Sequence, residues 1–209
     1  MLSEILGKKV GMTQIFDGQK NVVSATVIDI GGWIVTQIKN KEIDGYSALQ
    51  FGRPRKRYIG GAFEDSWLKN KKKFFEHIKE INVSENMTAN FKLGQEIKVS
   101  DLALNEKTVV KVSGTSRGLG FQGVVKRYNF SGGPSAHGSN FHRIPGSIGN
   151  MCSQGNVVKG KKLPGRCGFK KVTLKNLRVV KVDPENSCMF ISGSVPGKKD
   201  ALLSICKAG

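Results

Sequence analysis

Acidic side chains are missing from the middle of this sequence. No Asp or Glu occurs between Glu106 and Asp183, a stretch of 76 residues. A solvated helix face usually mixes both signs of charge. Neither a His–Asp pair nor a pair of carboxylates can be built locally where no carboxylate exists. The stretch instead predicts a surface for a polyanion. Its fifteen basic residues are Lys107, Lys111, Arg117, Lys126, Arg127, Arg143, Lys159, Lys161, Lys162, Arg166, Lys170, Lys171, Lys175, Arg178 and Lys181.

Long apolar runs and paired cysteines are also missing. No run approaches the roughly 18–20 apolar residues that a membrane-spanning helix needs, and the first nine residues lack the order of a signal peptide. No two cysteines have C-x-x-C spacing, so neither a zinc ribbon nor a redox pair is supported. We expect reduced thiols in a cytosolic-type compartment. The cysteines are Cys152, Cys167, Cys188 and Cys206.

What the chain has in excess is positive charge. It contains 209 residues, 38% of them hydrophobic, with 34 Lys and Arg against 16 Asp and Glu, a net charge of +18. This length can bury an ordinary hydrophobic core in one or two domains. Because such an excess of charge repels itself in a compact state, it predicts a polyanionic partner. Nucleic acid is the first candidate, and an acidic membrane surface is the second.

Short β-type segments separated by turn residues account for much of the chain. Many short strands of this kind indicate a barrel or a sandwich. Alternating or β-branched residues predict strands at 22–30, 33–38, 46–51, 96–99, 107–112, 172–182, 188–192 and 201–206.

One helix is predicted, from Ser66 to Ile81. Trp67, Phe74 and Ile78 recur in it at multiples of three and four residues. Four lysines between 69 and 73 occupy much of its other surface, and the basic run 53–57 precedes it. Residues 52–94 are therefore predicted to form an inserted subdomain with a second basic patch. A membrane-surface binder would need a longer amphipathic helix with Trp and Leu on one face.

Residues 129–168 show no usable periodicity and are rich in Gly, Ser, Asn and Pro. A structureless loop of this length inside a compact domain is uncommon, and is usually functional or disordered. A loop without a core of its own can still be ordered by an external surface. The phosphate backbone of a nucleic acid is the surface that its charge fits.

Gly118-Leu-Gly120-Phe-Gln-Gly123 matches the G-x-G-x-x-G fingerprint of dinucleotide-binding folds. That site also needs a helix opening at the third glycine and an acid about 20 residues further on. Here the next acid is Asp183, sixty residues after Gly123. A dinucleotide-dependent enzyme remains an alternative. The preferred interpretation is that the glycines let the backbone approach RNA closely, among basic residues and the stackable rings of Phe121 and Tyr128.

The histidines do not complete a metal or catalytic site. His137 and His142 lie in the acid-free stretch without a nearby carboxylate or Cys-x-x-Cys partner, and His77 lies on the predicted helix. We interpret the first two as neutral hydrogen-bonding or stacking groups. The sequence thus predicts no catalytic residue, no metal and no cofactor. A free regulatory RNA binder would have the same charge pattern and stays open.

Several motifs resemble the bacterial-type large-subunit ribosomal protein L three family. They occur in the family's order and cover nearly the whole chain. The resemblance implies a mainly β fold, namely a six-stranded β-barrel of the translation-protein type with an α+β insertion and a long basic irregular extension loop. The motifs are GKKVGMTQIF at 7–16, GTSRGLGFQGVVKRYNF at 114–130, HRIPGSIG at 142–149, GKKLPGRCG at 160–168 and VPG at 195–197.

The resemblance also implies a function and partners. A family member is a non-enzymatic structural constituent of the large ribosomal subunit, in the cytoplasm or in an organelle. It binds 23S-type rRNA directly, nucleates assembly and sends its extension toward the peptidyl transferase centre. The implied partners are large-subunit rRNA and neighbouring proteins of the L fourteen and L nineteen families, with no membrane contact.

Carried over by motif, the barrel core is expected at 1–51, 95–125 and 169–209, the insertion at 52–94, and the extension at 126–168 with its deepest part near 145–158. The expected RNA-binding residues are Lys8, Lys9, Arg117, Lys126, Arg127, Tyr128, His137, His142, Arg143, Ser147, Asn150, Lys159, Lys161, Lys162, Arg166, Lys170 and Lys171.

Three positions depart from the family pattern. Tyr128 stands where a Trp is usual, which keeps a stackable ring of a different size. Cys152 stands where some relatives carry a methylated Gln, so no modification is expected there. LPGRCG at 163–168 replaces a more common Met-Ala-Gly-x-Met-Gly and adds the charge of Arg166.

Overall fold

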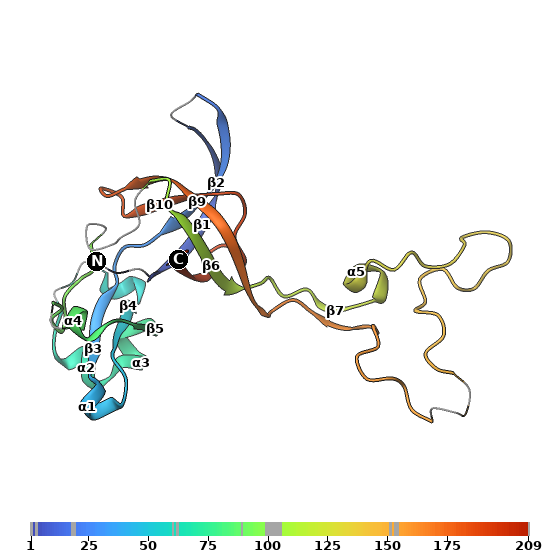
Figure 1. Ribbon diagram of the computed structural model, residues 1–209, viewed down its shortest axis with the longest axis horizontal. Coiled ribbons are helices and arrows are strands. Elements are labelled where there is room, and N and C mark those ends of the chain that lie inside the picture. The colour runs from blue at the N-terminus through green and yellow to red at the C-terminus, as the bar shows by residue number, and fades with distance from the viewer. Residues whose placement is uncertain are drawn as a thin grey trace. The chain divides into compact units, whose positions relative to one another are not determined.

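A computed structural model describes residues 2, 4–17, 20–59, 61, 63–88, 90–98, 106–150, 152 and 155–208. The chain divides into two compact units. Figure 1 colours the chain by residue number, from blue at the N-terminus to red at the C-terminus. The first, here called the barrel unit, comprises Met1–Thr115 and Lys171–Gly209. The second, here called the basic unit, is Ser116–Lys170 and contains all of the expected loop 126–168.

Six strands of the barrel unit close into a barrel in the order β1-β11-β6-β9-β10-β2, every neighbouring pair being antiparallel. Closure leaves no free edge where the ring is complete. Alternate residues face inward, so that Met189 and Ile191 of β10 and Leu203 and Ile205 of β11 are fully buried. The prediction of a mainly β protein is confirmed. The strands are β1 (Glu4–Phe16), β2 (Val22–Asp29), β6 (Val109–Thr115), β9 (Lys171–Asp183), β10 (Cys188–Ser192) and β11 (Leu202–Lys207).

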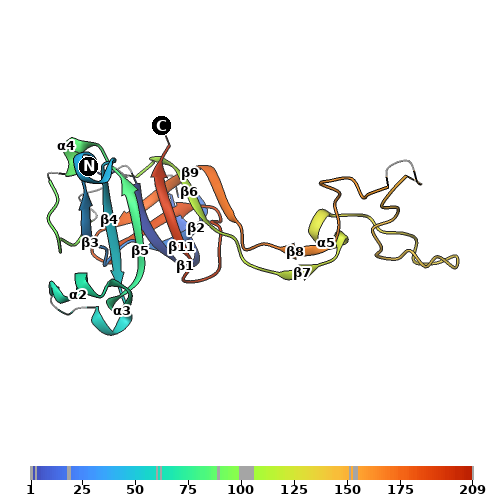
Figure 2. The ribbon, with the colours of Figure 1, turned by 90° about the horizontal axis from the view of Figure 1, so that it is seen from below.

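A second, three-stranded sheet stands beside the barrel within the same unit (Figure 2). Its strands β3 (Ile34–Lys39), β4 (Ala48–Pro54) and β5 (Phe75–Asn82) pair in that order. Trp33, Phe51 and Ile81 belong to the same hydrophobic core as Ile28 and Ile205 of the barrel. The two sheets therefore share one core. Short helices α1 (Lys41–Asp44) and α4 (Glu85–Thr88) follow β3 and β5.

The helix predicted from Ser66 to Ile81 is wrong beyond Phe74. The structure has the 3-10 helix η1 (Lys56–Tyr58), then α2 (Ser66–Lys69) and α3 (Lys71–Phe74), and then strand β5. β5 pairs with β4 along its whole length, and Phe75 and Ile81 are buried against the rest of the unit. The spacing of Phe74, Ile78 and Ile81 by four and three residues fits a helix, whereas in the structure Phe75 and Ile81 are the buried residues of a strand. Pairing with β4 therefore overrides the local pattern.

The remaining strand predictions differ mainly at the ends. At 96–99, however, the strand prediction is wrong in the described part, where Glu96 makes only an isolated bridge to Ile34, and Val99 lies outside the described residues. β1 is missed because a bulge between Lys9 and Gly11 interrupts its alternation and its outer half is exposed. No pattern of apolar residues revealed this strand.

Candidate nucleic-acid interface

The basic unit begins and ends at a two-stranded stem. β7 (Gly120–Gln122) and β8 (Gly165–Cys167) pair antiparallel, with Phe121 opposite Arg166. The Leu119 amide donates to the Cys167 carbonyl at 3.0 Å, and the Ser116 amide donates to the Lys170 carbonyl at 2.9 Å. These bonds hold the two ends of the unit together. Strands of three residues rich in glycine carry no periodic signal, so the sequence predicted neither.

Gly168 is the residue that lets the stem close. Its φ is +76°, and a Cβ at this position would lie 2.1 Å from the carbonyl oxygen of Arg117. Only glycine combines that dihedral angle with so close an approach of two backbones. Gly168 is not one of the fingerprint glycines, and their close approach to RNA stays a prediction.

The third glycine of the fingerprint precedes a very short helix. α5 (Val124–Tyr128) follows Gly123 and stops at Asn129, whose φ of 58° and ψ of 40° are left-handed. The helix has five residues and carries the buried Val124. It is much shorter than the helix of a dinucleotide-binding βαβ unit, so the geometry disfavours the alternative of a dinucleotide-dependent enzyme.

Arg127 and Tyr128 form a small cluster at the end of α5. Arg127 Nη1 donates to the Leu163 carbonyl at 2.6 Å, and its guanidinium carbon lies 5.0 Å from the Tyr128 ring centroid. Lys162 Nζ lies 5.9 Å from the same centroid, and the Phe130 ring lies 6.3 Å away. Arg127 thus fastens the returning chain to α5. The ring of Tyr128 has two cations near it, at cation–π distances.

The two predicted histidines lie in a loop that closes on itself. The Gly133 amide donates to the carbonyls of Phe141 and His142 at 2.9 and 3.2 Å. His137 occupies a left-handed conformation with φ of 57° within that loop, and both His137 and His142 are exposed. Their rings are accessible, and the loop is held by these backbone bonds and by the Phe141 amide, which donates to Ser139 Oγ at 3.3 Å.

Burial contributes almost nothing to the basic unit. Of its described residues only Val124 is buried. Eight of its nine basic residues are exposed, the exception being the half-buried Arg127, and the sequence places no acid among them. These cations therefore have no carboxylate within the unit to neutralise them. The nine are Arg117, Lys126, Arg127, Arg143, Lys159, Lys161, Lys162, Arg166 and Lys170.

Large aromatic side chains are exposed among these cations. Phe121 is 77% exposed and Phe169 is 64% exposed. The guanidinium carbon of Arg166 lies 5.2 Å from the Phe169 ring centroid. In proteins that bind single-stranded nucleic acids, bases stack on exposed aromatic rings that lie beside basic side chains. Phe169 was missed as a site residue, although its place between Gly168 and Lys170 was a usable signal.

The remaining predicted residues of the basic unit are near its middle. Ser147 Oγ donates to the Gly149 carbonyl at 3.0 Å, which turns the chain locally. Asn150 and Cys152 are exposed. Of the expected deepest part, 145–158, residues 151, 153 and 154 lie outside the described residues.

Lys8, Lys9 and Lys171 belong to the barrel unit instead. The Lys8 side chain is 11% exposed, and its Nζ donates to Glu76 Oε2 at 2.5 Å. Lys9 Nζ donates to the carbonyls of Val195 and Gly197 at 2.9 and 3.2 Å, and burial lowers its pKa. Both lysines therefore bind groups of their own unit. Lys171 is exposed at the first position of β9.

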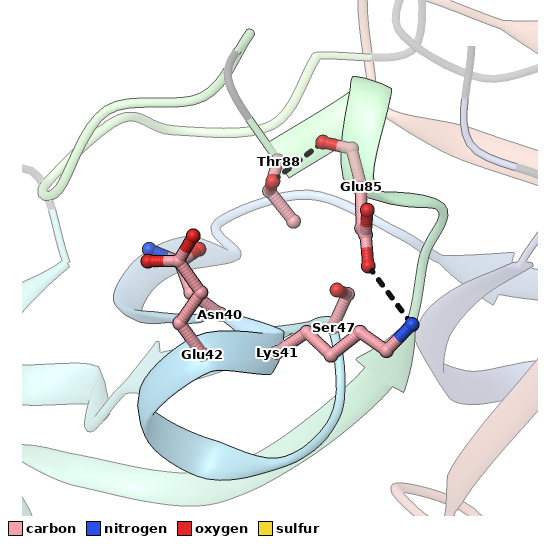
Figure 3. A pocket seen from close by; sticks show the side chains of 6 residues that line it. All are labelled: Asn40, Lys41, Glu42, Ser47, Glu85 and Thr88. Atoms are coloured by element: carbon pink, nitrogen blue, oxygen red, sulfur yellow. Dashed lines mark hydrogen bonds and ion pairs between the residues drawn. The ribbon is translucent and has the colours of Figure 1, made fainter.

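A polar hollow of the barrel unit lies between α1 and α4 (Figure 3). Lys41 Nζ lies 3.7 Å from Glu85 Oε1, and Thr88 Oγ1 donates to the Glu85 carbonyl at 2.7 Å. With its cation already facing a carboxylate, the hollow offers no free charge for a polyanion. The lining residues are Asn40, Lys41, Glu42, Ser47, Glu85 and Thr88.

The described ranges hold neither a candidate metal site nor a candidate membrane-spanning helix. They contain no group of three His, Cys, Asp or Glu side chains arranged to hold a metal ion. In the same part of the chain no helix has the length and apolarity to cross a membrane.

Known proteins with similar sequences match across both units. The profile of the family described as Ribosomal protein L3 matches residues 77–190. A large ribosomal subunit protein uL3 from Prochlorococcus marinus strain MIT 9515 is 41% identical over 203 residues, which cover 96% of this chain and 92% of that protein. The uL3 protein of Staphylococcus epidermidis strain ATCC 12228 is 38% identical, over 98% of this chain and 96% of its own. The chain therefore belongs to the ribosomal protein L3 family and is a structural, non-enzymatic constituent of the large ribosomal subunit.

Proposed function

We propose that the basic unit binds large-subunit rRNA directly, through phosphate contacts of its exposed lysines and arginines. The observation that carries this proposal is a unit with nine basic residues, no acid and, among its described residues, one buried side chain. A segment without a core gains too little from burial to offset the entropy of ordering it. Binding to phosphates supplies that free energy, because each contact releases condensed counterions.

The membership of the family supports a finer arrangement, which is part of the proposal. The barrel, of the translation-protein type, would anchor the chain at the rRNA surface from 1–51, 95–125 and 169–209, with 52–94 as its insertion. Residues 126–168 would pass through rRNA toward the peptidyl transferase centre. Binding would occur early and nucleate assembly, with neighbours of the L fourteen and L nineteen families.

The residues considered for RNA binding fall into three groups: exposed cations, exposed rings, and side chains already bound within the protein. The exposed cations Lys159, Lys161 and Lys162 follow one another closely, and we assign them to phosphates. Phe121 and Phe169 would stack on unpaired bases. Arg127 would act mainly by positioning Leu163, and Lys8 and Lys9 are left out because their ammonium groups are bound within the barrel unit.

The salt dependence of RNA binding tests this assignment. We expect the triple variant Lys159→Gln, Lys161→Gln, Lys162→Gln to weaken binding to a large-subunit rRNA fragment. The slope of log K against log salt should fall by about 2–3, since each phosphate contact contributes about 0.7–0.9. Filter binding at salt concentrations from about 50 to about 300 mM measures the slope.

A matched control separates specific contacts from net charge. Lys198, Lys199 and Lys207 are exposed lysines of the barrel unit that the proposal leaves out. Their triple change to Gln removes the same charge and should leave the slope nearly unchanged. Equal slopes for the two triple variants would remove 159–162 from the interface.

A further inference from the structure

The hairpin formed by β1 and β2 continues beyond the barrel as a two-stranded ribbon, drawn in blue in Figure 1. β1 pairs with β11 only from Glu4 to Lys8. From Gly11 to Phe16 its sole partner among the described strands is β2, with Phe16 opposite Val22. The other edge of this part of β1 therefore has no strand beside it in the described chain.

One face of the ribbon carries exposed apolar side chains on both strands, with the polar Gln14 and Ser24 between them. Phe16 is 76% exposed, Val22 59% and Met12 54%. Phe16 and Val22 are direct cross-strand partners, and Met12 lies an even number of residues from Phe16, so all three share a face. Exposed apolar side chains that gather in this way mark interaction surfaces.

The ribbon also lacks charge. Residues 10–16, VGMTQIF, contain no charged side chain, and residues 10–24 contain only Asp17 and Lys20, in a chain whose net charge is +18. A surface without cations has little to offer phosphates. Free strand edges are usually protected by Lys, Pro or a bulge that turns them away. Here the exposed edge past the bulge has no such charge or proline, which indicates that another chain covers it.

We propose that the free edge of β1, from Val10 to Phe16, docks an extended segment of another protein of the large subunit. The segment would add a strand beside β1, and its apolar side chains would cover Met12, Phe16 and Val22. This interface goes beyond the proposed binding of rRNA, since it lies on the barrel unit and uses no cation. Neutral backbone pairing and apolar cover are the chemistry of a protein partner.

Site-specific photocrosslinking tests this proposal in the assembled particle. The photoreactive residue p-benzoylphenylalanine replaces Phe16 in the full chain, and purified large subunits are irradiated. We expect crosslinks to a different ribosomal protein, identified by mass spectrometry of the crosslinked peptides. The matched control places the same group at Ile43, which is 86% exposed on α1 of the same unit. Its yield of protein crosslinks should be at least about fivefold lower.

Other outcomes would overturn the proposal. Crosslinks from position 16 mainly to rRNA, to a second copy of this chain, or no more abundant than from position 43 would each do so. None of these outcomes would affect the assignment of the basic unit to rRNA, which is tested with different residues.

A second variant tests the interface without a photoreactive group. Phe16→Ser with Val22→Thr should lower the amount of the crosslinked partner in salt-washed subunits several-fold, while this chain stays bound. Because both side chains are exposed, the Tm of the free protein should stay within about 2 °C. Ile43→Ser is the matched control and should retain the partner. Unchanged partner occupancy in the double variant would contradict the docking model.

Discussion

At the scale of single residues, the basic unit is shaped by backbone geometry instead of burial. Gly168 brings its own backbone against Arg117, and Gly133 hydrogen-bonds to two carbonyls across its loop. A guanidinium N–H of Arg127 donates a hydrogen bond to the Leu163 carbonyl. Each contact fixes the path of the chain, while the exposed cations around it stay free for a ligand. The cations that are most available for binding are thus those that make no stabilising contact within the unit.

Gly168→Ala tests this role of the backbone. A methyl group 2.1 Å from the Arg117 carbonyl oxygen, at φ of +76°, cannot be accommodated without moving the two backbones apart. We expect a cost of about 1–3 kcal/mol, which the RNA must supply on binding. Affinity for a large-subunit rRNA fragment should therefore fall about 5- to 150-fold, as measured by filter binding.

Gly120→Ala is the control for that experiment. Gly120 lies in the same stem and has a similar φ of +71°, but a Cβ there would meet no atom within 4 Å. The control carries the conformational strain without the clash, so its loss of affinity should be clearly smaller. Equal losses at the two positions would show that close approach at the stem is unimportant.

At the scale of elements, two ion pairs link the barrel to the second sheet. Lys8 of β1 meets Glu76 of β5, and Arg53 of β4 pairs with Asp29 of β2. The hydrogen bond from Lys8 lowers the pKa of the Glu76 carboxyl. Burial, and then the charge of Lys8, lowers the pKa of the neighbouring His77. Strands far apart in sequence are thereby tied at polar positions as well as through the shared core.

The pH dependence of stability tests the Lys8–Glu76 pair. Because the folded pKa of Glu76 lies below its ordinary value of about 4.3, the ionised carboxylate stabilises the fold above that pH. The contribution is lost as the pH falls through the folded pKa. Glu76→Gln should therefore lower the free energy of unfolding at pH 7 by about 1 kcal/mol, a value reduced for the partial exposure of Glu76. Urea unfolding at two pH values measures it.

The difference in the free energy of unfolding between wild type and Glu76→Gln should shrink to nearly zero in acid. We expect this at a pH on the order of one unit or more below the ordinary pKa of Glu. Glu85→Gln is the matched control, because Glu85 and Lys41 form an ion pair whose side chains are 63% and 73% exposed. Such surface pairs contribute little. A loss for Glu76→Gln that persisted undiminished in acid would assign the effect to packing and not to charge.

At the scale of the whole molecule, the two units obtain their order from different sources. The barrel unit buries a continuous core of aliphatic and aromatic side chains that runs through both sheets. The basic unit has one buried residue among those described, and its charge is uncompensated by acids. The barrel unit should therefore fold without the central loop of the basic unit, whereas that loop should need its ligand.

Replacement of residues 129–163 by a short Gly/Ser linker tests this division. The linker keeps β7, α5 and β8 in the chain. We expect the thermal unfolding of the barrel unit to change by less than about 4 °C, because none of its core residues is removed. Assembly of large subunits containing the variant should fail or slow strongly, as seen in sucrose gradients. Normal assembly with normal translation would contradict the proposed function.

Much of the candidate interface could be read from the sequence, because net charge and composition need no knowledge of folding. The absence of acids from 107–182 is the same in any conformation. Strand β10 was predicted with its observed ends, since Cys188–Ser192 alternates and lies between turns. The family motifs likewise depend only on the order of residues, and the comparisons confirmed the family.

Tertiary structure alone decided which residues meet. β5 became a strand because β4 lies beside it, although its apolar spacing also fits a helix. Lys8 was withdrawn from the surface by Glu76, a partner 68 residues away, and Arg127 was turned toward the carbonyl of Leu163. Net charge is a sum over residues and hydrophobic periodicity is a local pattern, so both can be obtained from the sequence alone. Pairing between distant segments depends on the shape of the whole fold, and no local pattern contains it.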